Sequence, residues 1–297
     1  MMYSVVDIGS NTVRLVTYKT DGPKYVSVYT DFRAMELISK IENGRLIDSA
    51  VAELCDVLTC FKNNSPKGAV FLAFATAFMR VIENSEDVRK RILSDTGIDL
   101  EILSEEQEAI YSFNGIMRTA TQSEGIAADL GGGSCEFIKF EDKKPQIFKS
   151  LPFGCVKLGK MFVENNPFPS LSEMLSIRNY VTEQLAEVEW IKGTKEFILT
   201  GGTGKAFAQM GNFINKTSFP LSGYTFSYAN FERLYTEFTS FDTKYTDFIK
   251  SIMPSRIKTI YPGLEAAKAI VDYIGYPNIT ISTEGVREGF IAEISGR

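Results

Sequence analysis

Short apolar segments separated by turn residues open the chain. Residues 3–8, 13–18 and 24–29 are rich in Val, Tyr and Thr, and their links contain Gly9 and Gly22. Segments of this length and composition, bounded by such links, are typical of β-strands. The pattern therefore predicts a three-stranded meander at the start of the chain.

Helical periodicity follows this meander. After Asp48, apolar residues recur every three or four positions, at Val51, Leu54, Leu58 and Phe61. This spacing predicts a helix with one apolar face. Short strands are expected at 69–74 and 99–103. Between them we expect a second helix with Ser85 at its N-cap and Gly97 just past its end.

A capping-box pattern marks the next helix. Ser104 is followed three residues later by Gln107, and this pair satisfies two backbone N–H groups at a helix start. The helix is expected to run to about Met117. The small polar residues of 119–125 form the candidate domain boundary. The sequence thus predicts domains at 1–120 and 121–297, with the last helix a candidate to pack on the first domain.

The opening pattern then returns. Strands are expected at 125–130, 136–140 and 146–150, and Asp129 ends the first of them as Asp7 ends the first strand of the chain. Each aspartate is followed by an apolar residue and a glycine turn. Such internal repetition predicts two similar lobes, and we expect them to face each other across a cleft.

The remainder is mainly helical, with two short strands. Helices are expected at about 156–163, 171–191, 204–213, 231–238 and 264–274, and a last one from about 284. The interrupting strands are expected at 196–200 and 278–281. Alternation of strands and helices predicts an α/β fold class.

Three glycine-rich turns carry the candidate binding chemistry. Glycine allows successive backbone N–H groups to point at one anion, and Asp7 or Asp129 offers carboxylate oxygens to Mg²⁺. A third turn lies between a strand and a helix, which is another context for phosphate. Reversal of the chain direction would explain any one of these glycine turns alone. The occurrence of two repeated turns together with a third favours a role in binding. The candidate phosphate-binding residues are Gly9, Ser10, Asn11, Gly131, Gly132, Gly133, Ser134, Gly201, Gly202 and Thr203.

Composition excludes several function classes. The 297 residues contain no histidine, which rules out Ser-His-Asp and Cys-His catalysis. A net charge of −5 disfavours a nucleic-acid partner. No apolar run approaches the ~18 residues needed to cross a bilayer, so no membrane partner is expected. The four cysteines lack Cys-x-x-Cys spacing and are typical of a cytoplasmic protein with reduced thiols.

Three charged residues outside the turns are further candidates. Glu108 lies about one turn into its predicted helix, where an acidic residue also favours the helix dipole. A role as general base and a purely local role both remain open. The guanidinium groups of Arg80 and Arg287 suit two-point phosphate contacts, although surface arginines are common.

The two turn motifs together resemble a known family. Asp7-Ile8-Gly9-Ser10-Asn11 and Asp129-Leu130-Gly131-Gly132-Gly133-Ser134 are similar to motifs of the exopolyphosphatase and guanosine pentaphosphate phosphohydrolase (Ppx/GppA) family, in its short two-domain form. Further matching segments are 75–80, 103–109, 151–156, 200–205 and 284–289.

The resemblance implies a fold and an activity. The fold would be two ribonuclease-H-like lobes with mixed sheets flanked by helices, as in actin, hexokinase and Hsp70, with an active-site cleft between them. The activity would be Mg²⁺-dependent release of terminal orthophosphate from inorganic polyphosphate. Guanosine penta- or tetraphosphate is the other candidate ligand, and a homodimer is expected because family members of this architecture are commonly dimers.

The same resemblance implies residue roles. Glu108 matches the family's catalytic glutamate and would be the general base for water. Arg80 and Arg287 match its phosphate-binding arginines. Asp129 and Glu136 match acidic residues of the second phosphate loop.

A metal site follows from the same match. Mg²⁺ is expected at Asp129 and Glu136, with Asp7 a third candidate ligand, and a monovalent cation is a second candidate cofactor. Asp129 is also counted with the catalytic group.

Two departures from the family pattern keep alternatives open. Gln107 replaces the first glutamate of the family's Glu-Glu pair, and 262–266 departs from its Pro-Gly-Arg-Ala-Asp stretch. A weakly catalytic sensor of guanosine tetra- or pentaphosphate would bind nucleotide tightly without turnover. A small-molecule kinase of the same superfamily would consume ATP only with an acceptor present. An actin-like filament protein would sediment with nucleotide.

Overall fold

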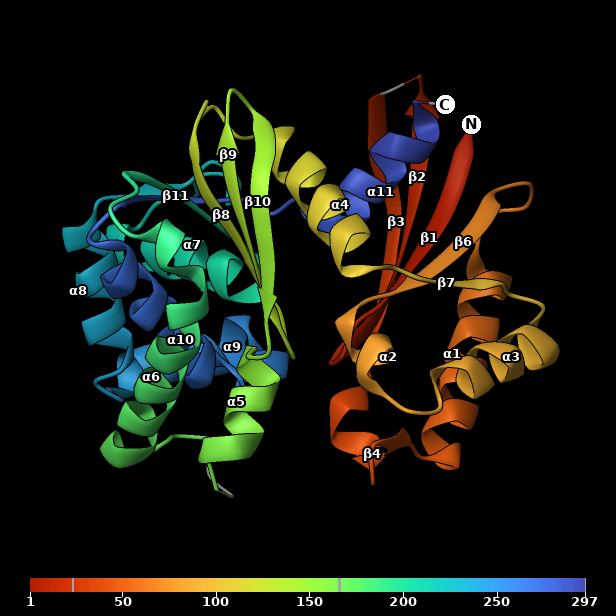
Figure 1. The fold of residues 1–297 in the computed structure, drawn as a ribbon, viewed down its shortest axis with the longest axis horizontal. Coiled ribbons are helices and arrows are strands. Elements are labelled where there is room, and N and C mark those ends of the chain that lie inside the picture. Colours follow the sequence, from red (N-terminus) through yellow and green to blue (C-terminus); the bar gives the residue numbers. More distant parts are fainter. Residues whose placement is uncertain (23, 165–166, 297) are drawn as a thin grey trace. The chain divides into compact units, whose positions relative to one another are not determined.

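The computed structural model of the chain describes residues 1–22, 24–164 and 167–296. They divide into two compact units, one of Met1–Tyr111 with Arg287–Arg297 and one of Ser112–Val286. Each unit contains one large β-sheet flanked by helices (Figure 1). The protein is therefore of the α/β class, as expected.

The first sheet begins with the predicted meander. Its strand order is β3-β2-β1-β6-β7. The antiparallel strands are β1 (Met2–Ile8), β2 (Thr12–Asp21) and β3 (Lys24–Ala34), and β6 (Val70–Ala75) and β7 (Leu100–Ile102) continue the sheet in parallel. The three predicted strands are confirmed, but β3 extends five residues beyond the expected end at 29.

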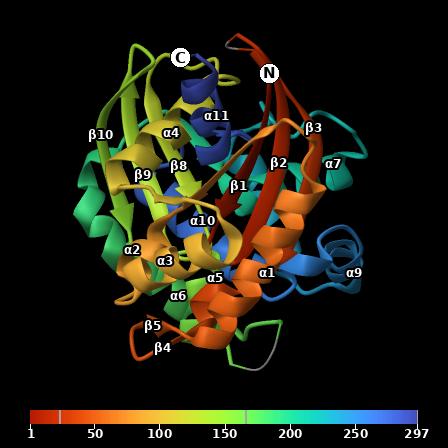
Figure 2. The same cartoon turned by 90° about the vertical axis from the view of Figure 1, so that its right-hand side faces the viewer.

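Helices cover both faces of this sheet. Helices α1 (Asp48–Asn64) and α3 (Ser85–Thr96) bury apolar side chains against one face, and they lie together in both ribbon views (Figures 1 and 2). On the other face lies α11 (Val286–Ser295), whose Phe290 ring is 4.8 Å from that of Phe74. The last helix of the chain thus completes the first unit.

Short elements fill the rest of the first unit. They are the 3₁₀ helix η1 (Leu37–Lys40), β4 (Ile41–Glu42), β5 (Arg45–Leu46), α2 (Ala77–Val81) and α4 (Glu105–Met117), which continues into the second unit. The capping box of α4 is confirmed, because Ser104 Oγ accepts from the Gln107 N–H at 3.1 Å and Gln107 Oε1 accepts from the Ser104 N–H at 2.9 Å. The predicted N-cap of α3 is wrong by one residue. Asn84 holds that position, and its side chain binds the backbone of Leu46.

The second sheet repeats the plan of the first. Its order is β10-β9-β8-β11-β13-β12. The antiparallel strands are β8 (Gly125–Leu130), β9 (Cys135–Glu141) and β10 (Lys144–Leu151), followed in parallel by β11 (Glu196–Thr200) and β13 (Asn278–Ile281), with a short β12 (Thr225–Phe226) at the edge. The predicted bounds of β8, β11 and β13 are confirmed.

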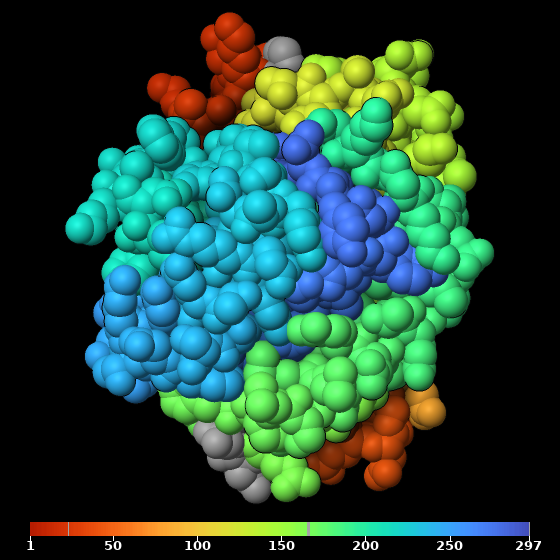
Figure 3. Space-filling model, turned by 90° about the vertical axis from the view of Figure 1, so that its left-hand side faces the viewer, coloured from red at the N-terminus to blue at the C-terminus, as the bar shows by residue number. Residues whose placement is uncertain are grey.

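A thick helical layer covers one face of this sheet. It contains α5 (Cys155–Phe162), α6 (Leu171–Leu185), η2 (Ala186–Ile191), α7 (Gly201–Asn215), α8 (Tyr228–Phe238), α9 (Thr243–Ile252), η3 (Pro254–Arg256) and α10 (Ile260–Ile274). Figure 3 looks onto this layer, with green α6 and the cyan to light-blue segment of α8 and α9 at the surface. None of the helices in the described ranges is long and apolar enough to span a bilayer.

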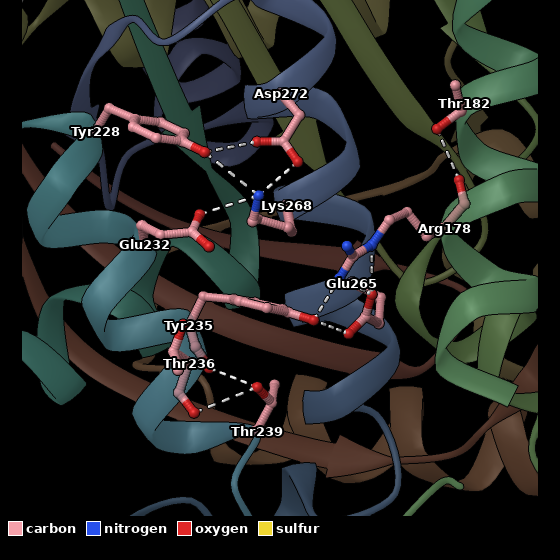
Figure 4. A network of polar contacts seen from close by, with 10 residues as sticks. All are labelled: Arg178, Thr182, Tyr228, Glu232, Tyr235, Thr236, Thr239, Glu265, Lys268 and Asp272. Atoms are coloured by element: carbon pink, nitrogen blue, oxygen red, sulfur yellow. Dashed lines mark hydrogen bonds and ion pairs between the residues drawn. The ribbon is translucent and has the colours of Figure 1, made fainter. Parts of the chain in front are cut away.

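An ionic network lies inside this layer (Figure 4). Glu265 on α10 is fully buried, and its carboxylate accepts from Arg178 Nε and Nη2 at 3.1 and 3.0 Å. The Tyr235 hydroxyl donates to the other oxygen, and Lys268 pairs with Glu232 at 3.0 Å. Charged groups buried in this way require partners. The network therefore joins α6, α8 and α10.

Candidate functional site

The first Asp-x-Gly turn, which follows Asp7 and contains Gly9, joins β1 to β2. The Gly9 N–H donates to the Thr12 carbonyl at 3.1 Å and closes the turn. The carbonyl of Ser10 accepts from the Ile38 N–H at 3.0 Å, and the carbonyl of Asn11 accepts from the next segment of the chain, from Met35 and Glu36, both at 2.9 Å. Residues 35–38, which include the start of η1, therefore occupy the carbonyl side of this turn.

The second Asp-x-Gly turn, which follows Asp129 and contains Gly131, joins β8 to β9 and closes in the same way. The Gly131 N–H donates to the Ser134 carbonyl at 3.1 Å. The Gly131 carbonyl accepts from the Cys155 N–H at 3.0 Å. The Gly132 carbonyl accepts from the first turn of α5, at 2.9 and 3.0 Å. A Cβ atom on Gly154 would lie 2.4 Å from the Gly132 carbonyl carbon, so only glycine allows this approach.

This anchoring fixes the direction of the turn amides. In a trans peptide the C=O and the following N–H point in opposite directions, and no described peptide bond is cis. Because the carbonyls of Ser10 and Asn11 face residues 35–38, the N–H groups that follow them point away from those residues. The same argument applies to the N–H groups of Gly132 and Gly133, which point away from α5. Each unit thus presents a pair of amides suited to an anion.

A row of polar residues crosses the second sheet beside its turn. Asp129 on β8 lies opposite Glu136 on β9, and Glu136 lies opposite Ser150 on β10. Directly opposite residues share a face, with Cβ atoms about 5 Å apart. Ser150 Oγ donates to Glu136 Oε1 at 2.8 Å, and Ser112 Oγ donates to Asp129 Oδ2 at 3.3 Å. Two carboxylates are therefore brought together.

The structure assigns Asp7 to a different setting. Asp7 lies opposite Arg14 in the first sheet, and Arg287 Nη1 is 3.4 Å from its Oδ2. Burial raises the pKa of Asp7, while Arg287 and Arg14 act to lower it. In the first unit the strand-end carboxylate is thus accompanied by cations. Within the described residues, no group of three or more Asp, Glu, Cys or His side chains lies close enough to hold a metal ion.

Arg80 and Glu108 come together within the first unit. The five-residue helix α2 carries Arg80, and α4 carries Glu108 in its first turn. Arg80 Nη1 donates to Glu108 Oε2 at 2.6 Å and to the Leu103 carbonyl at 2.8 Å. Glu108 is only 5% exposed. The guanidinium therefore fixes the orientation of a buried carboxylate.

The third glycine-rich segment is the start of a helix. Gly201, Gly202 and Thr203 form the first turn of α7, directly after β11. The expected helix start at 204 was therefore too late. A Cβ atom on Gly202 would fall about 2 Å from the guanidinium of Arg256, so this arginine lies on the N-terminus of α7. The Thr203 hydroxyl is buried and faces Gly263 of α10.

Sequence reasoning missed Arg256, and it missed the partners of Arg287. Arg287 Nε and Nη2 donate to Glu288 Oε1 at 3.1 and 2.9 Å, and Nε also donates to the Tyr18 hydroxyl at 3.1 Å. The one sequence sign of Arg256 was the Gly201-Gly202 pair, which allows close approach. For Tyr18 no local signal exists, because its partners lie at the other end of the chain.

The fold and the turns define a two-unit α/β protein with an Asp-x-Gly turn in each unit. The model of the Ppx/GppA phosphatase family matches residues 33–297, and the chain belongs to this family. Exopolyphosphatase 1 of Mycobacterium tuberculosis is 29% identical over 193 residues, 63% of this chain and 56% of the relative. This match spans little more than half of that relative. Exopolyphosphatase 1 of Mycobacterium leprae is 25% identical over 98% of this chain and 88% of the relative.

Solved structures share the fold. The Ppx/GppA family member from Aquifex aeolicus has a TM-score of 0.82 and 24% identity, with 99% of this chain and 97% of that chain covered. An exopolyphosphatase from Cytophaga hutchinsonii has a TM-score of 0.88 and 22% identity, with 99% and 98% covered. The predicted class of two ribonuclease-H-like units with mixed sheets is confirmed.

Proposed function

We propose that this protein hydrolyses terminal phosphoanhydride bonds and releases orthophosphate from inorganic polyphosphate, with guanosine pentaphosphate as a second substrate. Membership of a phosphatase family and the names of the matched relatives support this substrate class. The observation that carries the proposal is the turn geometry. In both units the carbonyls are engaged on one side, so the amides are directed to the other.

The chemical step assigned to the protein is a single in-line displacement. The oxygen of a water molecule attacks the terminal phosphorus. The bond to the bridging oxygen breaks, and its electron pair remains on the shortened chain. Glu108 accepts the proton of the attacking water, with Arg80 holding its carboxylate in place. Arg80 and Arg287 are the cations assigned to the charge on the transferring group.

Direct attack by water is favoured over a covalent intermediate. Burial raises the pKa of the Cys135 and Cys155 thiols, so neither is a thiolate at neutral pH. The sequence contains no histidine that would activate a serine. The proposed reaction therefore needs only the carboxylate base and the cations.

Asp129 and Glu136 fit a Mg²⁺ ion that is shared with phosphate. Mg²⁺ is usually bound through one or two carboxylates together with substrate phosphates, and these two residues are opposite partners on β8 and β9. When bound, the ion would neutralise charge on the phosphate oxygens. Asp7, the third candidate, already has Arg287 and Arg14 as counter-charges, so we assign the ion to Asp129 and Glu136 without it. A monovalent cation is the second cofactor that we propose.

Both departures from the family pattern have local structural roles. Gln107 completes the capping box of α4, and Glu265 in the altered 262–266 stretch forms the buried pair with Arg178. Neither change removes a group from the turns or from the Arg80–Glu108 pair. Both are therefore compatible with turnover, which favours the hydrolase over the sensor.

The first test measures phosphate release with Mg²⁺ from long-chain polyphosphate, guanosine pentaphosphate and ATP. Glu108→Gln is expected to slow release about 10²–10⁴-fold, the usual contribution of a general base, while polyphosphate still binds. Glu106→Gln, an exposed change in the same helix turn, is the matched control and should retain wild-type turnover. Full activity of Glu108→Gln would overturn the assignment of the base.

The outcome for each substrate separates the remaining alternatives. Release from the nucleotide alone would change the substrate but keep the mechanism. Tight nucleotide binding with no release would establish the sensor. We also propose a cytoplasmic homodimer. Analytical ultracentrifugation tests the dimer, and nucleotide-dependent sedimentation would indicate the filament protein instead.

A further inference from the structure

Arg287 is held by an unusual set of contacts within the first unit. It lies in the first turn of α11, and its side chain is 15% exposed. Both of its bonds to Glu288, from Nε and from Nη2, end on the same oxygen, Oε1. A guanidinium group whose two N–H donors bind a single oxygen can rotate about that oxygen. These two bonds alone therefore do not fix the direction of Nη1.

Besides the long Nη1 bond to Asp7 at 3.4 Å, Tyr18 supplies a further point of attachment. Its side chain extends from β2 and is 2% exposed. The hydroxyl donates to Glu288 Oε1 at 2.9 Å and accepts from Arg287 Nε at 3.1 Å. Burial raises the pKa of this phenol, so it keeps the proton it donates. The hydroxyl thus braces the guanidinium against rotation about Oε1.

The carboxylate at the centre of these contacts is itself fixed. Glu288 is 8% exposed, and the Tyr25 hydroxyl donates to its backbone carbonyl at 3.1 Å. The rings of Tyr18 and Tyr25 pack edge to face, with centroids 5.2 Å apart. The two tyrosines therefore share one environment and one partner residue. Of the two, Tyr18 is the one whose hydroxyl bonds Arg287.

We propose that Tyr18 is a positioning residue that orients Arg287, so that Nη1 stays beside Asp7 at the end of β1. The Asp7 carboxylate is 3.4 Å from Nη1 and lies two residues before the Gly9 turn. The kinetic consequence rests on the proposed function, because it requires Arg287 to contact the transferring phosphoryl group. The orientation of Arg287 does not, and it can be measured without substrate.

The test compares Tyr18→Phe with Tyr25→Phe. Each variant keeps its ring and loses one hydroxyl that bonds Glu288. The first readout is hydrogen exchange at the Arg287 Nε–H, followed by ¹⁵N NMR and assigned with Arg287→Lys. We expect the wild-type proton to be protected, and its exchange to accelerate at least about tenfold in Tyr18→Phe, as for loss of a bond to a charged group. Tyr25→Phe should preserve the protection.

Wild-type protein alone can overturn this inference. If the Arg287 Nε–H exchanges as fast as that of exposed Arg45, the guanidinium is not held, whatever the variants do. Equal acceleration in both variants would also overturn it, because the effect would then be general loosening around Glu288. Thermal unfolding of both variants checks that each is folded during the measurement.

The second readout is steady-state phosphate release. Tyr18→Phe should lower kcat roughly tenfold with KM nearly unchanged, because the orientation of Arg287 would act in the transition state. Tyr25→Phe should match the wild type. If wild-type protein releases no phosphate yet the exchange difference is found, the proposed function fails and the positioning role stands. If release is normal and exchange is unchanged in Tyr18→Phe, the opposite holds.

Discussion

The two units build the same turn but place residues of opposite charge across from its aspartate. In both sheets a three-stranded meander is followed by parallel strands, and an aspartate is the next-to-last residue of the first strand. Opposite Asp7 lies Arg14, whereas opposite Asp129 lies Glu136. The first turn thus contains its own counter-charge, from Arg14 and Arg287. The second sheet instead places two carboxylates opposite each other, the arrangement to which we assign the proposed Mg²⁺ ion.

The support of the turns differs as well. Eight-residue α5 takes the carbonyls of the second turn with the N–H groups of its first turn, at a contact where only Gly154 fits. In the first unit the N–H groups of a loop and of the four-residue η1 bind the turn carbonyls instead. A repeated motif therefore preserves the backbone of the turn, while its supports and its charge diverge.

The largest expected effect concerns this charge difference. Glu136→Gln should raise the Mg²⁺ concentration for half-maximal phosphate release at least about 100-fold, because groups that only support a metal ligand already account for about 10–100-fold and Glu136 is assigned as a ligand itself. Arg14→Gln should leave that concentration unchanged even where the rate falls, because its charge belongs to the first turn. Titration of Mg²⁺ into chelator-treated protein measures both. An equal shift in the two variants would contradict the contrast between the units.

The next effect sharpens the contrast between the cores. The layer of α1 and α3 on the first sheet buries apolar side chains, whereas the helical layer on the second sheet buries Glu265 with Arg178. Arg178→Met should cost about 3 kcal/mol of unfolding free energy, the low end for a broken buried pair because Arg178 is partly exposed. Arg233→Met breaks an exposed pair on α8 and should cost less than about 0.5 kcal/mol. Urea denaturation compares them, and similar losses would show that burial of Glu265 does not matter.

The smallest effect tests the support of the second turn. Gly154→Ala places a methyl group inside contact distance of Gly132 and should cost about 1–3 kcal/mol through overpacking. Phosphate release should fall with it, because the turn is displaced. Gly159→Ala in the same helix meets only ordinary contacts at 3.4 Å and should be neutral or stabilising by up to about 1 kcal/mol. A Gly154→Ala variant with wild-type melting temperature and turnover would disprove this close packing.

Local signals explain why much of the fold was predictable. The strands at 125–130, 196–200 and 278–281 match because short apolar runs end at turn residues. Helix α2 was missed, because five residues span little more than one helical turn and leave no repeat of the apolar spacing to detect. The starts of α7 and α10 were predicted too late, because Gly201-Gly202 and Pro262-Gly263 resemble turns but serve close helix contacts. The ten-residue α9 was not predicted at all.

The candidate site was predictable only where chemistry and local sequence coincide. The glycine turns could be located because each follows a strand-end aspartate. The pairing of Arg80 with Glu108 and the position of Arg256 on Gly202 depend on tertiary contacts that no local pattern encodes.

The bond between Tyr18 and Glu288 spans 270 residues of sequence, and this has a consequence for synthesis. The second unit is one continuous stretch, Ser112–Val286, while the first needs Arg287–Arg297 to be complete. On the ribosome, domains fold as their segments emerge. The continuous unit can therefore finish folding first, whereas Phe74 of the first sheet lacks its packing partner Phe290 until α11 has emerged. This interval, rather than the finished protein, is when the chain is most exposed to aggregation and to chaperones.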